Sequence, residues 1–503
     1  MKRNFVNSLI SLAIFALITG GFRAESASPS TVNNFYLPPE LSKKLEAYAQ
    51  EGMRKWHTPG LAIGIVKGDQ LAWSGYFGYA DLKNQEPISE NSVFETASVS
   101  KTFTAIGIMQ QYEQGKFQLD DPVNQFSPYA LYRPGKKSCR EVIFLDILTH
   151  TSGAGELMSW RQMAFLLPTL LVPDNFERPP LKVLFIDGIR PEICPGTKYA
   201  YCNFCFGGLG LILEHLSGET FNDYMDEHIL KPLGMTHSHF YETDDIVKNL
   251  ATGYTQVLGK YEAVPFMRYP VTPMCGLYSS VNDMSRYLIG LLNNGRLEQA
   301  QILKPETLSL MFSPHYSVDT RLEKIGLCFF IQDFYGHKLI GHDGANPGYG
   351  TQMYIAPEDK IGIIVFSNIM NNSAYEIGHG LLKILLQIDK PEKDFAEARN
   401  LWQSFVGDYG SIEPELLTDF RFYQRARGVY KVRIKKDQLW LESATGSSPR
   451  RLRQVHPDDP YFYEIIIPNS EIPRYLVFTP GDNGKVKSIK IGLNEYVRVA
   501  RHF

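Results

Sequence analysis

The sequence has little net charge and few cysteines. Its 503 residues carry 51 basic and 54 acidic side chains, a formal net charge of −3. Proteins that bind nucleic acid usually carry a basic face, so the charge balance gives no support to a nucleic-acid partner. Only six cysteines occur, which excludes a small scaffold held together by disulfides.

Glycine, proline and apolar residues show no excess either. With 41 glycines, 30 prolines and 44% hydrophobic residues, the chain lies outside the collagen-like and low-complexity classes. Its length gives roughly three domains as a prior. Composition therefore indicates a globular protein of several domains, and the chemistry must come from local motifs.

Long apolar runs are scarce. Lys2 and Arg3 precede an apolar stretch from Leu9 to Phe22, and no acidic residue appears before Glu25. A basic start followed by about 14 apolar residues is typical of a secretory signal peptide and is short for a membrane-spanning helix. We expect residues 1–27 to form a signal peptide and the protein to be periplasmic or extracellular. An uncleaved anchor and a buried core helix are the alternatives.

A second apolar segment, residues 163–172, contains Pro168 and is followed by Pro173. One interpretation is an ordinary buried helix. The other is a lid, a membrane-touching element or a partner surface, because a sizeable exposed apolar patch needs such a function.

Export would allow the cysteines to form disulfides. Cys194, Cys202 and Cys205 lie close together in the sequence, and the other three are scattered. A zinc site at Cys202-x-x-Cys205 would need two further ligands, for which Cys194 and His215 are the candidates. We expect small buried thiols or one local disulfide instead.

Strand-like segments occur at both ends of the first 388 residues. The segments 61–66 and 71–79 flank a Gly/Asp turn and predict a β-hairpin. The segments 351–356 and 361–366 predict a second strand pair, preceded by a Gly/Pro-rich turn at 341–350. With a mostly helical middle between them, this order predicts an α+β fold in which the two ends share one sheet.

The chain changes its periodicity after the charged linker 389–400. From residue 430 to 435, apolar and basic residues alternate. Further segments have strand composition, namely 438–442, 461–467, 475–478, 486–491 and 496–499. Short strands at this spacing predict an all-β barrel or sandwich. The predicted domains are therefore residues 35–388 and 401–503.

Ser98 and Lys101 form an S-x-x-K motif at the predicted start of a helix over residues 94–115. A serine in the first turn lies near the positive end of the helix dipole, which favours developing negative charge. The lysine lies one turn further along the same face and can reach the serine oxygen. The pair is therefore a candidate serine nucleophile with an amine neighbour.

Two further motifs supply polar groups. Tyr201 and Asn203 stand on a turn-rich segment, so both can point into a cleft, the tyrosine as proton carrier and the asparagine as hydrogen-bond partner. In the H-x-G motif of His342 and Gly344, the glycine lets the backbone approach a ligand, so that a neighbouring N–H can serve as an oxyanion donor.

In this order, the three motifs resemble those of penicillin-binding proteins and class C β-lactamase-related serine hydrolases, over roughly residues 40–388. The resemblance implies an antiparallel sheet with flanking helices and a helical subdomain, and no cofactor or metal. It implies an acyl-enzyme on Ser98, with Lys101 and Tyr201 relaying the proton. The implied substrate-binding and oxyanion residues are Asn203, His342, Gly344 and Ala345, with the Ser98 N–H. Residues 401–503 resemble the lipocalin-like barrel that follows some of these hydrolases.

His342 stands where β-lactamases usually carry lysine. A lysine there is permanently charged and binds a substrate carboxylate, whereas an unperturbed histidine, with a pKa near 6.5, is mostly neutral above pH 7. We therefore expect weaker dependence on a free carboxylate. The alternative is that His342 only closes a strand end.

The resemblance predicts an exported serine hydrolase acting on D-amino-acid peptides or amides, such as D-alanyl-D-alanine cell-wall fragments. The alternatives are a carboxylesterase, a weak β-lactamase, and a penicillin-binding sensor or scaffold without turnover. The expected partners are small peptide, amide or ester substrates and no nucleic acid. Membrane contact through residues 163–172 or an uncleaved N-terminus, and a homo-oligomer, stay open.

Overall fold

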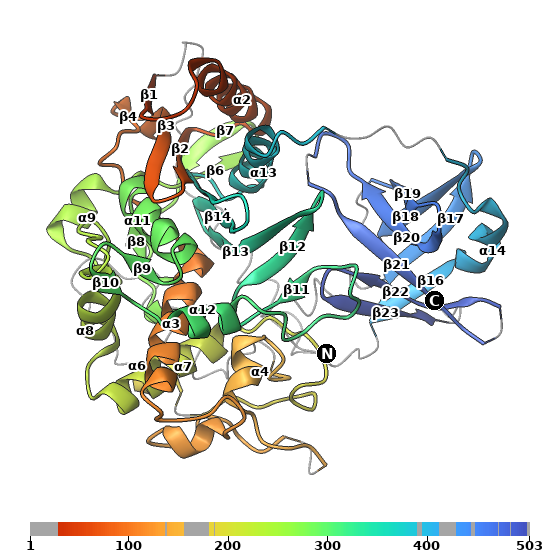
Figure 1. Ribbon diagram of the computed structural model, residues 1–503, viewed down its shortest axis with the longest axis horizontal. Helices are drawn as coiled ribbons and strands as arrows, with labels where there is room; N and C mark the ends of the chain where they lie inside the picture. The colour runs from red at the N-terminus through yellow and green to blue at the C-terminus, as the bar shows by residue number, and fades with distance from the viewer. Residues whose placement is uncertain are drawn as a thin grey trace.

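The computed structural model (Figure 1) describes residues 29–135, 138–154, 181–185, 187–389, 395–411, 429–443, 448–470, 472–482 and 484–499. The expected signal peptide, 1–27, and the apolar segment 163–172 lie outside these residues. The described chain forms an α+β part followed by a closed β-barrel. The predicted fold class is confirmed.

One nine-stranded sheet forms the centre of the α+β part. Its order is β1-β3-β2-β15-β14-β13-β12-β11, and β4 pairs with β3. Strand β15 runs antiparallel to β2, with Ser367 opposite Leu61, so the two ends of this part share one sheet as predicted. The strands are β1 Ser30–Asn34, β2 Gly60–Lys67, β3 Gln70–Asp81, β4 Glu86–Pro87, β11 Lys324–Ile325, β12 Phe330–Phe334, β13 His337–Asn346, β14 Tyr349–Ala356 and β15 Ile361–Ser367.

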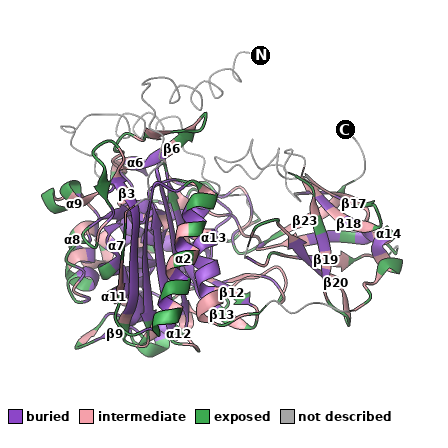
Figure 2. Cartoon of the chain, turned by 90° about the horizontal axis from the view of Figure 1, so that it is seen from above, coloured by how far each residue is buried: buried purple, intermediate pink, exposed green. Residues whose placement is uncertain are grey.

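Helices cover both faces of this sheet (Figure 2). On one face α2 (Pro39–Trp56) and α13 (Ser373–Leu385) pack together over an apolar cluster that includes Leu45 and Ile63. On the other face α11 (Val281–Leu292) packs over β2 and β15. Its N-terminus is fixed by the Ser280 side chain, which accepts a hydrogen bond from the Asp283 N–H, a common N-cap.

A helical subdomain holds the segment with the S-x-x-K motif. Helix α3 packs against α7, and α10 touches both. The remaining elements of the α+β part are β5 Phe94–Glu95, η1 Ala97–Val99, α3 Ser100–Glu113, η2 Val123–Phe126, α4 Phe144–Leu148, α6 Leu181–Leu184, α7 Asn203–Ser217, α8 Phe221–Met225, η3 Asp226–Leu230, α9 Asp244–Asn249, β6 Tyr254–Val257, β7 Lys260–Ala263, α10 Thr272–Cys275, β8 Tyr278–Ser279, β9 Arg296–Leu297, β10 Ala300–Gln301 and α12 Pro305–Met311.

The C-terminal part is a closed barrel of β16 to β23. In β18, Leu439 and Leu441 are buried and their neighbours are not, which is the period-two pattern that predicted strands. From α14, Phe405 stacks on Phe478 inside the barrel at 4.1 Å between ring centroids. The elements are η4 Arg399–Leu401, α14 Trp402–Phe405, β16 Gly407–Ser411, β17 Val429–Lys435, β18 Gln438–Ser443, β19 Arg450–His456, β20 Asp459–Ile466, β21 Tyr475–Pro480, β22 Val486–Ile491 and β23 Asn494–Val499.

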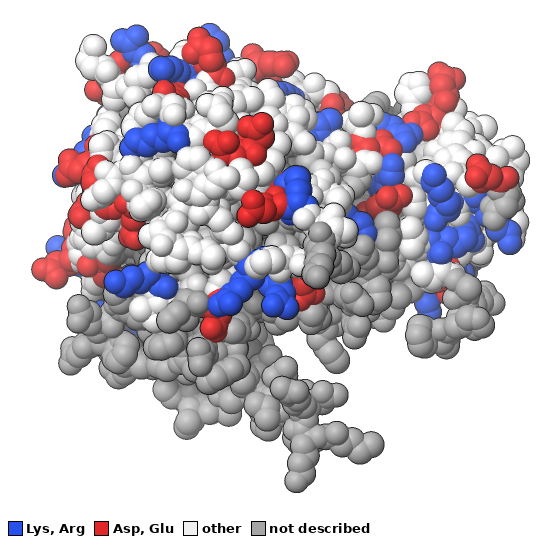
Figure 3. Space-filling view, turned by 90° about the horizontal axis from the view of Figure 1, so that it is seen from below, with Lys and Arg blue, Asp and Glu red and all other residues white. Residues whose placement is uncertain are grey.

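Polar contacts dock the barrel on the α+β part. Arg321 reaches from the segment before β11 to Asp459 of β20, with 2.7 Å between Nη1 and Oδ2. Lys55 of α2 donates to the Asn469 carbonyl at 2.7 Å. Over much of the face shown in Figure 3, basic and acidic side chains are interspersed, in keeping with the near-zero net charge.

The structure pairs four cysteines. Cys202 and Cys205 form the expected local disulfide, which removes them as zinc ligands, and Cys139 pairs with Cys194. The second bridge was not predicted because its cysteines lie 55 residues apart. Cys275 and Cys328 are buried and unbridged.

The turn predicted at 341–350 is present but much shorter than expected. Strand β13 runs on to Asn346, and the chain turns only at Pro347 and Gly348. The glycines of this segment allow close approach within the sheet instead of bending it.

None of the described helices has the length and apolar character needed to cross a membrane.

Candidate active site

Ser98 lies in a tight turn ahead of a helix. The 3-10 turn η1 contains it and leads into α3, so Ser98 precedes the helix and does not occupy its first turn as predicted. Ala97 has a φ of 50°, an uncommon conformation for a residue with a side chain that often marks functional sites. From Ser92 to Met109, every residue is buried except Ser98. The turn therefore presents a single hydroxyl at the surface.

Lys101 is fully buried and points at that hydroxyl. Its Nζ donates to Ser98 Oγ at 2.9 Å and to the Met274 carbonyl oxygen at 2.7 Å. The backbone carbonyl holds the amine in place, which compensates in part for the loss of hydration. Lys101 can thus take a proton from Ser98 or stabilise its alkoxide.

Tyr201 lies beside the same amine. The Lys101 Nζ is 5.2 Å from the centroid of the Tyr201 ring. The other side of the tyrosine is set by His150, whose ring stacks on it at 4.2 Å and whose Nδ1 accepts the Cys202 N–H at 3.2 Å. His150 therefore orients the tyrosine. Burial, followed by the charge of Lys101, holds the pKa of His150 well below its ordinary value.

Strand β13 runs against the turn that carries Ser98. A methyl group placed on Gly344 would lie 2.2 Å from the Thr96 carbonyl oxygen and 3.2 Å from the Ser98 nitrogen. Glycine is required because a side chain would separate the two backbones. Ala345 follows Gly344 directly and is exposed, so its backbone continues from the contact between Gly344 and the Ser98 turn.

His342 is buried near Tyr201 and Lys101. Its ring centroid lies 6.3 Å from that of Tyr201. Nδ1 donates to the Asp343 carbonyl oxygen at 2.6 Å, so in the neutral ring Nε2 is the unprotonated nitrogen. Burial, and after it the Lys101 ammonium, lower the pKa of His342 to about 3. This position therefore carries no charge at neutral pH.

Asn203 begins α7, two residues after Tyr201, and is half-buried. The structure thus gathers Ser98, Lys101, Tyr201 and His342 around one point. Their roles in a reaction stay a prediction, taken up below.

Two contributors escaped the sequence reasoning. The Met274 carbonyl that holds Lys101 has no signature, because any residue supplies a backbone oxygen. Glu95, three residues before Ser98, is buried and accepts a hydrogen bond from the Asn346 side chain at 2.7 Å. An acidic residue between Phe94 and Thr96, in an otherwise uncharged stretch, was the signal available for it.

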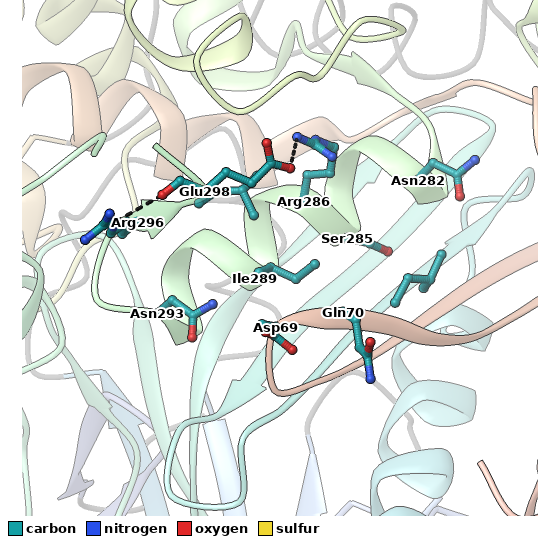
Figure 4. A pocket seen from close by; sticks show the side chains of 11 residues that line it. Asp69, Gln70, Asn282, Ser285, Arg286, Ile289, Asn293, Arg296 and Glu298 are labelled. Carbon is teal, nitrogen blue, oxygen red and sulfur yellow. Dashed lines mark hydrogen bonds and ion pairs between the residues drawn. The ribbon is translucent and has the colours of Figure 1, made fainter. Parts of the chain in front are cut away.

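A hollow of about 640 Å³ lies elsewhere, beside the β2–β3 turn and along α11 (Figure 4). Arg286 and Glu298 form an ion pair across it at 3.2 Å. It includes none of the predicted site residues. Within the described ranges, no three His, Cys, Asp or Glu side chains gather as a metal site.

Comparisons with known proteins point to one family. The family model described as Beta-lactamase matches residues 45–386. A beta-lactamase of Yersinia enterocolitica is 25% identical over 73% of this chain and 95% of its own length. The unguisins hydrolase ungD' of Aspergillus campestris is 25% identical over 73% and 68%. The octameric penicillin-binding protein homologue from Pyrococcus abyssi, a solved structure, is 25% identical with a TM-score of 0.60, covering 91% of this chain and 99% of that one.

Proposed function

The chain belongs to the Beta-lactamase family of serine hydrolases, and from this premise we propose that it cleaves small peptide or amide substrates through an acyl-serine, with D-amino-acid peptides as the preferred class. The observation that carries the proposal is the contact of the buried Lys101 amine with the partly exposed Ser98 hydroxyl at 2.9 Å. A nucleophile and its base within hydrogen-bond reach are what such chemistry requires.

In the proposed reaction, Ser98 Oγ attacks the substrate carbonyl while its proton passes to the Lys101 and Tyr201 pair. The oxyanion is stabilised by the N–H groups of Ser98 and Ala345. The carbon–nitrogen bond then breaks, and the same pair returns the proton to the leaving amine. Water attacks the acyl-serine, which releases the acid and restores the hydroxyl.

The neutral His342 favours substrates that need no fixed cation at this position. Peptides blocked at the C-terminus, amides and esters fit this requirement better than free carboxylates. One relative at 25% identity is named a hydrolase of unguisins and another a beta-lactamase, and both names agree with acyl transfer.

The proposal is tested by incubating wild type, Ser98→Ala and Lys101→Met with a fluorescent penicillin, a p-nitrophenyl ester and a D-Ala-D-Ala peptide amidated at its C-terminus. We expect wild type to turn over the peptide and Ser98→Ala to lose roughly 10³-fold or more. Ser313→Ala, a serine remote from the site, serves as control and should react as wild type.

Each outcome has a defined meaning. A wild type that reacts with none of the three probes refutes the hydrolase proposal. Turnover of the ester alone would establish the carboxylesterase alternative, turnover of the penicillin the β-lactamase. A stable acyl adduct on Ser98, without product, would establish the sensor or scaffold.

The His342→Lys variant tests the proposed selectivity. We expect the ratio of kcat/KM for a D-Ala peptide acid to kcat/KM for its methyl amide to rise, because a lysine brings a carboxylate-binding charge. The overall rate should fall, since a second cation is placed beside Lys101. An unchanged ratio would refute the selectivity argument.

We also propose that the protein works outside the cytoplasm. Two disulfides, Cys139–Cys194 and Cys202–Cys205, support this because such bridges persist in oxidising compartments. Fractionation of cells that express the full chain tests it, and retention in the cytosol would refute it.

Association into oligomers is supported by the octameric structural relative, and sedimentation of the purified protein tests it.

A further inference from the structure

The two backbone segments that meet at the site are joined by a buried bond between side chains. Asn346 Nδ2 donates to Glu95 Oε2 at 2.7 Å. Glu95 stands three residues before Ser98, and Asn346 follows Ala345 directly. The bond therefore joins the segment just before Ser98 to the residue just after Ala345.

Glu95 is held from several sides. Its carbonyl oxygen accepts the Thr351 hydroxyl of β14 at 3.2 Å, and in the β5–β8 pair it lies opposite Tyr278. The side chains of Glu95 and Asn346 are 3% and 6% exposed. Packed protein interiors do not deform continuously. A shift of one of these two side chains would therefore move the backbone segment of the other.

We propose that Glu95 is a positioning residue, which sets the separation of the Ser98 and Ala345 N–H groups through its hydrogen bond to Asn346. The inference rests on the proposed acyl-serine function and adds a residue that the three sequence motifs do not include. It acts through the backbone and does not touch the substrate.

The charge of Glu95 matters for the same site. Burial raises its pKa to about 8, the Asn346 hydrogen bond opposes the rise and the nearby Glu242 carboxylate adds to it. Tyr269 and Tyr349 face the same carboxyl, and burial raises the pKa of each, so neither carries charge at neutral pH. Glu95 is therefore a neutral acid near pH 7, and its side chain adds no negative charge to the segment that carries Ser98.

The consequence is a rate that depends on pH in a defined direction. Above about pH 8, Glu95 ionises and places a negative charge in the buried segment three residues before Ser98, which opposes the developing oxyanion, so acylation slows. Glutamine keeps the shape and an acceptor oxygen but cannot ionise. Glu95→Gln should therefore lose this alkaline decline.

The test measures kcat and KM for the best substrate from pH 6 to 10 in wild type, Glu95→Gln, Glu95→Ala and Asn346→Ala. We expect both alanine variants to lower kcat at pH 7 by about tenfold to 10²-fold, with little change in KM, because displacement of reacting groups by about 1 Å costs up to that much. The glutamine variant should restore kcat at pH 7 and stay active at pH 9.

A double variant, Glu95→Ala with Asn346→Ala, should lose no more than either single variant, since one bond is removed in each case. Glu376→Gln, which alters a buried carboxyl of α13, is the matched control and should keep the wild-type profile. Thermal unfolding of each variant separates misfolding from misplacement.

The failures of the two proposals are distinguishable. If wild type is inactive on every probe, the proposed function fails. If wild type is active and folded Glu95→Ala matches it at pH 7, or Glu95→Gln keeps the alkaline decline, Glu95 is not the positioning residue.

Discussion

At the scale of single residues, the site concentrates its positive charge on one amine. Lys101 stands between two imidazoles, and burial and its own charge lower the pKa of both His150 and His342. Because their pKa values are low, these imidazoles are weak bases and compete little with the lysine for the Ser98 proton. The proposed proton acceptor, Lys101, is therefore distinct from the two histidines near it.

Buried histidines predict a loss of stability in acid. His342 and His379 have pKa values lowered to about 3 and about 4, mainly by burial, whereas unfolded histidine titrates near 6.5. Below pH 6.5 the unfolded chain binds protons that the folded chain does not. The free energy of unfolding should fall by up to about 1.4 kcal/mol per pH unit for each group as the pH drops toward 4.

Urea unfolding of wild type and His342→Gln between pH 7 and 4.5 checks this. The variant should show a shallower decline. His456→Gln, an exposed histidine of the barrel, should keep the wild-type slope. Equal slopes in all three proteins would show that His342 is not protected in the fold.

The candidate reactive residues could be predicted from the sequence. The groups that hold them in place could not. Ser98, Lys101, Tyr201 and His342 are marked by short motifs, and the fold brings them together. The Met274 carbonyl has no side-chain signal. The pairing of Glu95 with Asn346 joins positions far apart in the chain, which no local pattern reports.

At the scale of elements, the site depends on how closely a strand approaches a turn. Strand β13 meets the Ser98 turn at Gly344, where backbone faces backbone. The distance between these elements sets the geometry of the proposed oxyanion donors. Any side chain at this contact would push the two elements apart.

Gly344→Ala is expected to reduce kcat by about 10²-fold or more, the scale of a lost oxyanion donor, and to destabilise the fold by about 1–3 kcal/mol through overpacking. Gly362→Ala on β15 is the matched control, because its methyl group would meet Leu288 Cβ at 3.3 Å. Steady-state kinetics and thermal unfolding give both numbers. Equal activity in the two variants would contradict the role of the close contact.

Removal of one disulfide is expected to affect mainly stability, and removal of the other mainly activity. By loop entropy, Cys139–Cys194, with a sequence separation of 55, contributes about 4 kcal/mol to stability, and Cys202–Cys205, with a separation of 3, about 2 kcal/mol. Cys202 follows Tyr201 directly and caps α7, so its loss should disturb the site more.

Serine pairs at each bridge test this by urea unfolding and by kcat. The Cys139–Cys194 variant should lose more stability, and the Cys202–Cys205 variant more activity. The reverse order of the two effects would show that Tyr201 does not depend on its neighbouring bridge.

Helices and strands with a clear local sequence pattern were predicted well. Elements whose conformation depends on tertiary contacts were not. The β2–β3 hairpin follows from two apolar segments around a Gly/Asp turn, and β17 follows from alternation. Strand β19 contains three arginines and gave no apolar pattern. The glycines of β13 favoured a turn locally, but pairing with β12 and β14 keeps the segment extended.

At the scale of the whole molecule, the barrel is held to the α+β part by polar contacts. Arg321 binds both Asp319 and Asp459, and Lys490 of β22 lies 3.5 Å from Asp319. Contacts of this kind are salt-sensitive and individually modest. The two parts are therefore expected to separate more easily than either unfolds.

A double-mutant cycle of Arg321→Ala and Asp459→Ala measures this docking. Because both side chains are about one-third exposed, we expect a coupling free energy of about 1 kcal/mol or less. Differential scanning calorimetry at low and at 1 M salt should show a smaller coupling at high salt. A coupling that salt leaves unchanged would mean that the pair does not act by charge.

The pairing of β2 with β15 also determines when the protein can first become active. Strand β2 ends at Lys67 and β15 begins at Ile361, so at 5–20 residues per second a ribosome needs on the order of tens of seconds to make the chain between them. During that time the apolar β2–β3 hairpin lacks its neighbour, and Ser98 has been made before His342. The proposed active site therefore cannot be complete in the nascent chain until the sheet closes.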